Sequence, residues 1–194
     1  RTVTGVQTCA LPICEVWHGA LGPQNVLLTA DGTVRLSDFG AWQVRRPPVA
    51  NDPDSLDVAR YLAPERWVDP TRVNAASDVF ALGVCLYEMF CGVPPYATTS
   101  AAVVEPQREA TQVLPERLRE LLEQCVAWDA GRRLPVAKVR QELCAVHADL
   151  FGKASPFAVL PAATWDADGW NNQGAAAWLA GRKGEADEIG RAHV

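Results

Sequence analysis

The first organised pattern of apolar residues in the chain predicts a β-hairpin. Two short aliphatic and β-branched runs, 26–28 and 33–36, flank an Asp-Gly pair at 31–32 that is typical of a tight hairpin turn. Pairing the runs as antiparallel strands brings Asn25 and Asp38, the residues just outside them, to the same end of the hairpin. We therefore expect these two polar side chains to lie close together.

Farther along, the pattern becomes that of helices. The stretch after Ser77 is apolar on every side, as in a buried helix, with Ser77 as its predicted N-terminal cap and Gly92 as its end. Two amphipathic helices are predicted to begin at Pro115 and Pro135. Their apolar faces carry Leu118, Leu121, Leu122, Cys125 and Val126 in the first helix, and Val136, Val139, Leu143, Val146 and Leu150 in the second. The pattern predicts an α+β fold that is mainly α, with one hairpin.

The chain has 194 residues, of which 48% are hydrophobic and 21% charged. This length and composition are typical of one soluble globular domain with a short additional segment. The net charge of -5, without a basic stripe, argues against nucleic-acid binding. Glu88 interrupts the most apolar run, so no membrane segment is expected. The six cysteines form no CxxC pair and no metal-ligand spacing, which favours reduced thiols in a cytoplasmic protein.

Asn25 and Asp38 are the candidate metal-binding residues of the hairpin. An amide oxygen beside a carboxylate suits Mg²⁺, which prefers hard oxygen ligands and keeps several waters. Asn and Asp are also common where strands begin and end, because their side chains stabilise turns by hydrogen bonds to nearby backbone groups. The pair alone leaves both interpretations open.

The two ends of the chain have an unusual relation. TCALPI (8–13) and IGRAHV (189–194) can be encoded by one DNA sequence read on opposite strands, and this DNA resembles a sequencing-library adapter. We interpret residues 1–13 and 188–194 as translated adapter, so the natural chain is expected to continue beyond both ends. The alternative is a genuine tail at each end.

Five motifs between the ends have an order and spacing that resemble the C-terminal lobe of a serine/threonine-type protein kinase. They are HGALGPQN (18–25), DFG (38–40), APE (63–65), SDVFALGVCLYEMFCGVPPY (77–96) and DAGRRLPVAKV (129–139). The resemblance implies a kinase-like fold for residues 14–152. Only the C-terminal lobe is expected, because no Gly-rich loop or strand lysine precedes it and the N-lobe is therefore absent.

The resemblance also implies roles for individual residues. Asn25 and Asp38 would face the metal and Leu27 would underlie the adenine ring, so Mg²⁺ and ATP are implied for the full-length parent. Half a site is present, so no cofactor binding is expected of this fragment. Three structural roles are implied as well: packing into the hydrophobic spine for His18, bracing of the catalytic loop for Asp78, and an ion pair of Arg133 with Glu65. The alternatives are a satisfied core histidine, a helix cap and a surface ion pair.

The positions that carry catalysis in the family hold other side chains here. Ala20 replaces the aspartate that accepts the substrate proton, Gly22 replaces the lysine, and Val58 aligns with the threonine that orients both. Gly19 replaces the arginine that receives an activation-loop phosphate. The loop beginning at His18 is thus degenerate and no catalytic residue is intact, which points to a pseudokinase.

After a Pro/Ala-rich linker at 153–165, residues 166–187 resemble the start of a tetratricopeptide repeat. Trp170, Gly174, Gly181 and Ala186 fit this pattern, whereas Gln173 and Ala177 depart from it. One repeat cannot bury its own apolar face, so it would be the beginning of a longer array. The alternative is an alanine-rich helix of no special class.

The combined expectation is a pseudokinase fragment that acts in signalling by binding protein partners, with or without nucleotide. The alternative is an active serine/threonine kinase that transfers the γ-phosphoryl group of ATP to protein, and a remoter one is a tetratricopeptide-repeat scaffold. An upstream Gly-rich loop and strand lysine would favour nucleotide binding, and several downstream repeats would favour the scaffold.

The adapter interpretation makes a direct prediction. Resequencing the source locus with a different library chemistry should replace residues 3–13 and 189–194 with unrelated codons. Recovery of identical ends from genomic DNA would contradict it.

Overall fold

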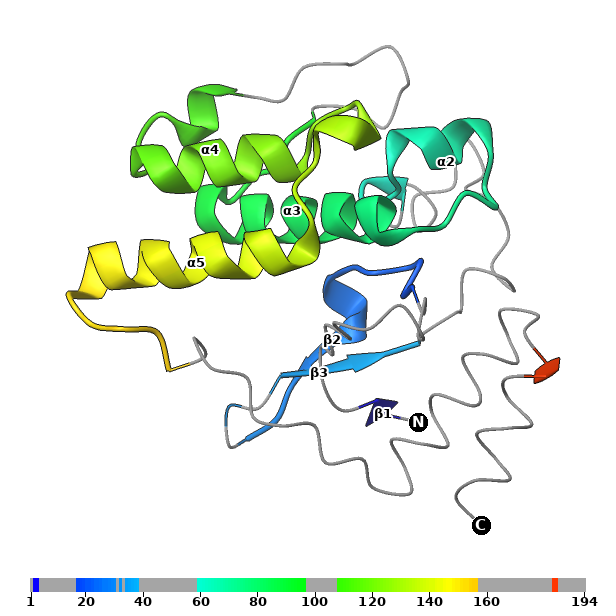
Figure 1. Ribbon diagram of the computed structural model, residues 1–194, viewed down its shortest axis with the longest axis horizontal. Coiled ribbons are helices and arrows are strands. Elements are labelled where there is room, and N and C mark those ends of the chain that lie inside the picture. The colour runs from blue at the N-terminus through cyan, green and yellow to red at the C-terminus, as the bar shows by residue number, and fades with distance from the viewer. Residues whose placement is uncertain are drawn as a thin grey trace. The chain divides into compact units, whose positions relative to one another are not determined.

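The computed structural model describes residues 2–3, 17–30, 32, 34–38, 59–96, 108–156 and 183–184 (Figure 1). The chain divides into two compact units, Arg1–Arg46 with Ala162–Val194, and Pro47–Pro161. Several predictions lie outside the described residues: Val58, most of the linker and of the tetratricopeptide-like stretch, and all but residues 2–3 of the adapter-like ends.

The first unit contains the predicted hairpin. A short 3₁₀ helix, η1 (Pro23–Asn25), leads into β2 (Val26–Leu28), which pairs antiparallel with β3 (Val34–Ser37). The second strand lies one residue later than predicted. Gly32 has φ +82, a left-handed conformation that glycine adopts without a Cβ clash and that a tight turn requires.

A third strand was not predicted. β1 (Thr2–Val3) pairs antiparallel with β3, so the strand order is β1-β3-β2 rather than that of a lone hairpin. This strand lies in the stretch that we interpret as adapter. Strand pairing uses backbone N–H and C=O groups, which almost every residue has. A two-residue strand is therefore compatible both with translated adapter and with natural sequence.

The second unit is helical. It consists of α2 (Pro64–Val68), α3 (Ala75–Cys91), α4 (Glu116–Cys125) and α5 (Val136–Phe151), with short 3₁₀ helices η3 (Arg108–Thr111) and η4 (Ala130–Arg132). Figure 1 shows α3, α4 and α5 side by side. One buried cluster joins Tyr87 of α3 to Leu118, Leu122 and Val146, and another joins Val79 to Leu121, Cys125 and Val139. The three predicted helices are confirmed, and each of them packs against the other two.

The beginning of α3 differs from the prediction. Asn74, rather than Ser77, is the N-terminal cap, and the helix begins at Ala75. The Asn74 side chain accepts a hydrogen bond from the Ser77 backbone N–H at 3.0 Å, and the Ser77 hydroxyl oxygen accepts one from the Asn74 N–H at 3.0 Å. Ser77 therefore occupies the third helical position of a reciprocal capping box.

The helix ends follow the predicted signals, with one exception at α5. Pro115 and Pro135 immediately precede α4 and α5, and Gly92 ends α3 with φ +73. Leu150 was predicted on the buried face of α5 but is 51% exposed. It lies in the last turn, beyond Val146, which is the last buried residue of this helix.

The described cysteines are free thiols, as expected: Cys85, Cys91, Cys125 and Cys144. Burial raises the pKa of Cys125 to about 12, and burial together with the charge of Glu88 raises that of Cys85 to about 12. Both thiols therefore stay protonated at neutral pH. No helix in the described part of the chain is long and apolar enough to span a membrane.

The contact between α3 and α4 depends on a glycine. A Cβ atom at Gly83 would lie 2.6 Å from Cys125 Cβ and 3.1 Å from the Cys125 backbone carbon. Alanine favours a helix over glycine by about 1 kcal/mol, but overpacking a core costs about 1–3 kcal/mol. We expect Gly83→Ala to lower the free energy of unfolding in urea. Glu120→Ala, on the exposed side of α4, should change it by less than about 0.5 kcal/mol. A Gly83→Ala variant that is more stable than the original chain would contradict the close approach of α3 to Cys125 of α4.

Candidate functional site

His18 opens the loop that resembles a kinase catalytic loop. It is 4% exposed, and its Nε2 lies 2.8 Å from the Ser37 carbonyl oxygen on β3. The Ala20 backbone N–H donates to Nδ1 at 3.3 Å. A carbonyl only accepts and an N–H only donates, so the neutral tautomer with its proton on Nε2 satisfies both contacts. His18 thus ties the loop to the hairpin, and its place in a hydrophobic spine stays a prediction.

Asn25 closes the same loop from the other end. Its side chain is 1% exposed, and its Nδ2 donates to the Ala20 carbonyl oxygen at 2.6 Å. The Asn25 backbone N–H donates to the Gly22 carbonyl oxygen at 2.9 Å. These contacts use the backbone of Ala20 and Gly22 and need nothing from their side chains. The shape of the loop therefore does not depend on the side chains at positions 20 and 22.

The strand register brings Asn25 and Asp38 to one end of the hairpin. Val26 lies opposite Leu36, so continuing the register places Asn25 opposite Ser37, with Asp38 the next residue along. Asp38 has φ 61, a left-handed conformation that costs most residues about 1–2 kcal/mol but that aspartate tolerates. Its side chain is exposed, whereas Asn25 is buried and its amide nitrogen makes the bond to Ala20. Two hard oxygen donors at one strand end suit Mg²⁺.

The two glycines of the loop, Gly19 and Gly22, differ in whether a larger side chain could replace them without strain. Gly19 has φ 70, so an arginine at this position would be strained. Gly22 has an extended φ of -173, which any residue adopts. A Cβ at Gly22 would meet only the end of the Gln24 side chain, at 2.6 Å, and that end can move because Gln24 is exposed. Leu27, expected under an adenine ring, is 40% exposed on β2.

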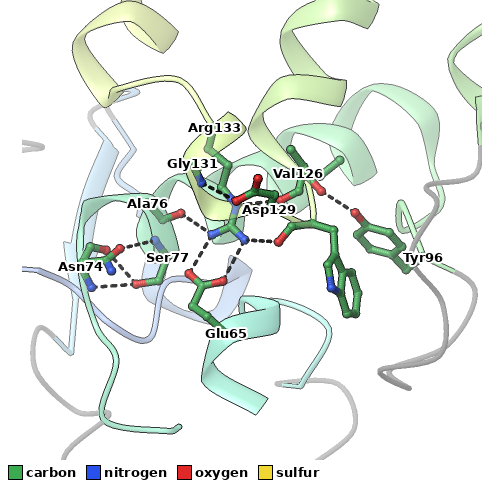
Figure 2. Close-up of polar contacts among 11 residues, drawn as sticks. Glu65, Asn74, Ala76, Ser77, Tyr96, Val126, Asp129, Gly131 and Arg133 are labelled. Atoms are coloured by element: carbon green, nitrogen blue, oxygen red, sulfur yellow. Dashed lines mark hydrogen bonds and ion pairs between the residues drawn. The ribbon is translucent and has the colours of Figure 1, made fainter. Parts of the chain in front are cut away.

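In the second unit, Arg133 pairs with Glu65, as the resemblance implied. Nη1 donates to Oε1 and Nη2 to Oε2, both at 2.8 Å, so the pair is bidentate (Figure 2). The side chain of Arg133 is 0% exposed and that of Glu65 is 12% exposed. The alternative of a surface ion pair is therefore wrong.

All five N–H donors of the guanidinium are used. Beyond the two bonds to Glu65, Nε donates to the Ala127 carbonyl at 2.8 Å, Nη1 to the Ala76 carbonyl at 2.9 Å and Nη2 to the Trp128 carbonyl at 3.1 Å. The guanidinium carbon also lies 4.9 Å from the centre of the Phe80 ring. One buried cation thus connects α2, the first turn of α3 and the segment before α5. Asp78 lies in that same first turn, and its expected contact with the catalytic loop stays a prediction.

Tyr61 makes a contact that the sequence did not reveal. Its hydroxyl donates to Glu88 Oε2 at 2.5 Å, which links the segment before α2 to the last turn of α3. Burial, and secondly this carboxylate, raise the pKa of Tyr61 above its usual value. The bond explains how the most apolar helix accommodates Glu88. No local signal marks such a pair, because the residues are far apart in the sequence.

A pocket in the second unit was also missed. It is lined by aromatic and proline side chains that include Trp67, Tyr96, Trp128, Pro64, Pro94 and Pro95. Tyr96 stacks on Phe80 with ring centres 6.0 Å apart and meets Trp128 edge-on, also at 6.0 Å. The Tyr96 hydroxyl donates to the Val126 carbonyl (Figure 2). The pocket is therefore walled by side chains that are themselves held in place.

The sequence profile of the family described as protein kinase domain matches residues 2–143. The match starts and ends earlier than the predicted 14–152. It covers most of the chain, and the chain belongs to the protein kinase domain family.

Relatives with curated descriptions are similar to the same region. Serine/threonine-protein kinase PknA of Corynebacterium glutamicum is 32% identical over 149 residues, which is 73% of this chain and 31% of the relative. PknA of Mycobacterium tuberculosis is 36% identical over 113 residues, 55% of this chain and 26% of the relative. An Aurora kinase of Eremothecium gossypii is 28% identical over 132 residues, 66% of this chain and 35% of the relative. The chain thus spans about a third or less of their length.

The buried pair makes a prediction about stability. Glu65→Gln leaves the guanidinium of Arg133 without a counter-charge in a site that water cannot reach, and breaking such a pair typically costs about 3–5 kcal/mol. We expect a loss of this size in the free energy of unfolding of the chain, measured in urea.

Arg117 provides the matched control for that measurement. It bridges Glu142 and Asp149, each at 3.0 Å, but its side chain is 49% exposed. Disrupting it with Arg117→Met should cost far less, and the loss should shrink further in high salt. Equal losses from the two variants would show that burial of Arg133 does not matter.

Proposed function

We propose that this chain is part of a pseudokinase, a protein kinase domain that acts by binding proteins rather than by transferring phosphate. The observation that carries the proposal is Ala20, which stands at the position of the proton-accepting aspartate in a loop whose backbone is otherwise well formed. A methyl group cannot accept a proton. A positioned general base is typically worth about 10² to 10⁴ in rate.

The other substitutions act in the same direction. Gly22 offers no charge to neutralise a transferring phosphoryl group, and Val58 offers no hydroxyl to orient its neighbours. One loss could be compensated by a water or a neighbouring side chain. The loss of base, counter-charge and orienting group together leaves phosphotransfer in the full-length parent near background.

Nucleotide binding is a separate matter, because it depends on other residues. Asn25 Oδ1 and the Asp38 carboxylate are the atoms that would hold Mg²⁺, and Leu27 would lie under the base. A bound Mg²⁺ would neutralise phosphate charge, and the ligand would rigidify the domain. The competing account is that Asn25 only closes the loop and Asp38 only ends its strand. The proposal covers binding of partners with or without nucleotide.

We propose that a protein partner contacts the half-buried side chains of Trp67, Tyr96 and Trp128, which line a small pocket of about 30 Å³. Aromatic side chains contribute large contact areas at a low entropy cost and are enriched at protein interfaces. Their ring contacts and the Tyr96 hydrogen bond preorganise this surface. This docking does not require the residues that catalysis would require.

Activity as a serine/threonine kinase is the second candidate. It is favoured by the presence of Asn25 and Asp38 and by the similarity to proteins named as serine/threonine or Aurora kinases. This chain covers about a third or less of those proteins. Similarity to them does not change the residue at position 20, which is an alanine and cannot act as a base. A scaffold of tetratricopeptide repeats would depend on residues 166–187, which lie almost wholly outside the described part of the chain.

A restoration experiment in the full-length parent tests the proposal. The variant carries Ala20→Asp, Gly22→Lys and Val58→Thr, and its matched control carries Ala20→Asn with the same two other changes. Asparagine has the shape of aspartate but cannot accept a proton. We expect phosphate transfer from radiolabelled ATP to a generic protein substrate to rise at least about 10²-fold with the aspartate and to stay near background with the asparagine.

Three results would count against the proposal. Unmodified parent that is already as active as the restored variant would favour the active-kinase candidate. Equal activity of the aspartate and asparagine variants would remove position 20 from the argument. No gain in either would show that the defect does not reside in this loop.

A further inference from the structure

We draw no further inference here: the strongest candidate, the aromatic- and proline-lined pocket beside α2 and the segment after α3 in the second unit, belongs to the docking site already proposed and overlaps the groove in which protein kinases receive their substrates, so it restates an established property of the family.

Discussion

The buried pair of Arg133 and Glu65 is the interaction on which the helical unit depends. A guanidinium without solvent exposure is stable only when all its donors are bonded and its charge is balanced, and Arg133 meets both conditions. Its acceptors come from α2, from the start of α3 and from the segment before α5. Those three segments are therefore constrained together, and the aromatic residues beside them, Phe80 and Tyr96, stack within the same framework.

The loop from His18 to Asn25 is held in shape mainly by bonds to backbone atoms. The bonds that hold it run from His18 and Asn25 to backbone atoms, and backbone atoms are the same whatever the side chain. The side chains at positions 20 and 22 take no part in these contacts, because only the backbone atoms of Ala20 and Gly22 are bonded. The shape of this loop therefore depends little on which side chains stand at positions 20 and 22.

Much of this architecture could be predicted because its signals are local. Gly32 in the hairpin turn, the prolines before α4 and α5, and Gly92 act through their own backbone conformations, and the pair of Arg133 with Glu65 was implied by the family resemblance. The cap of α3 was misassigned because Asn74 and Ser77 are both good caps, and only the reciprocal bonds decide between them. The bond from Tyr61 to Glu88 and the aromatic pocket join residues distant in sequence, for which periodicity carries no information.

We propose that the natural protein containing this chain binds partners but does not transfer phosphate. The most direct test measures phosphate transfer by the full-length parent, both to itself and to a generic protein substrate, beside its Asp38→Ala variant. The account predicts that the two proteins give the same near-background signal, because the base at position 20 is already missing. Robust turnover in the parent that Asp38→Ala abolishes would contradict it and establish an active kinase that works with a substituted loop.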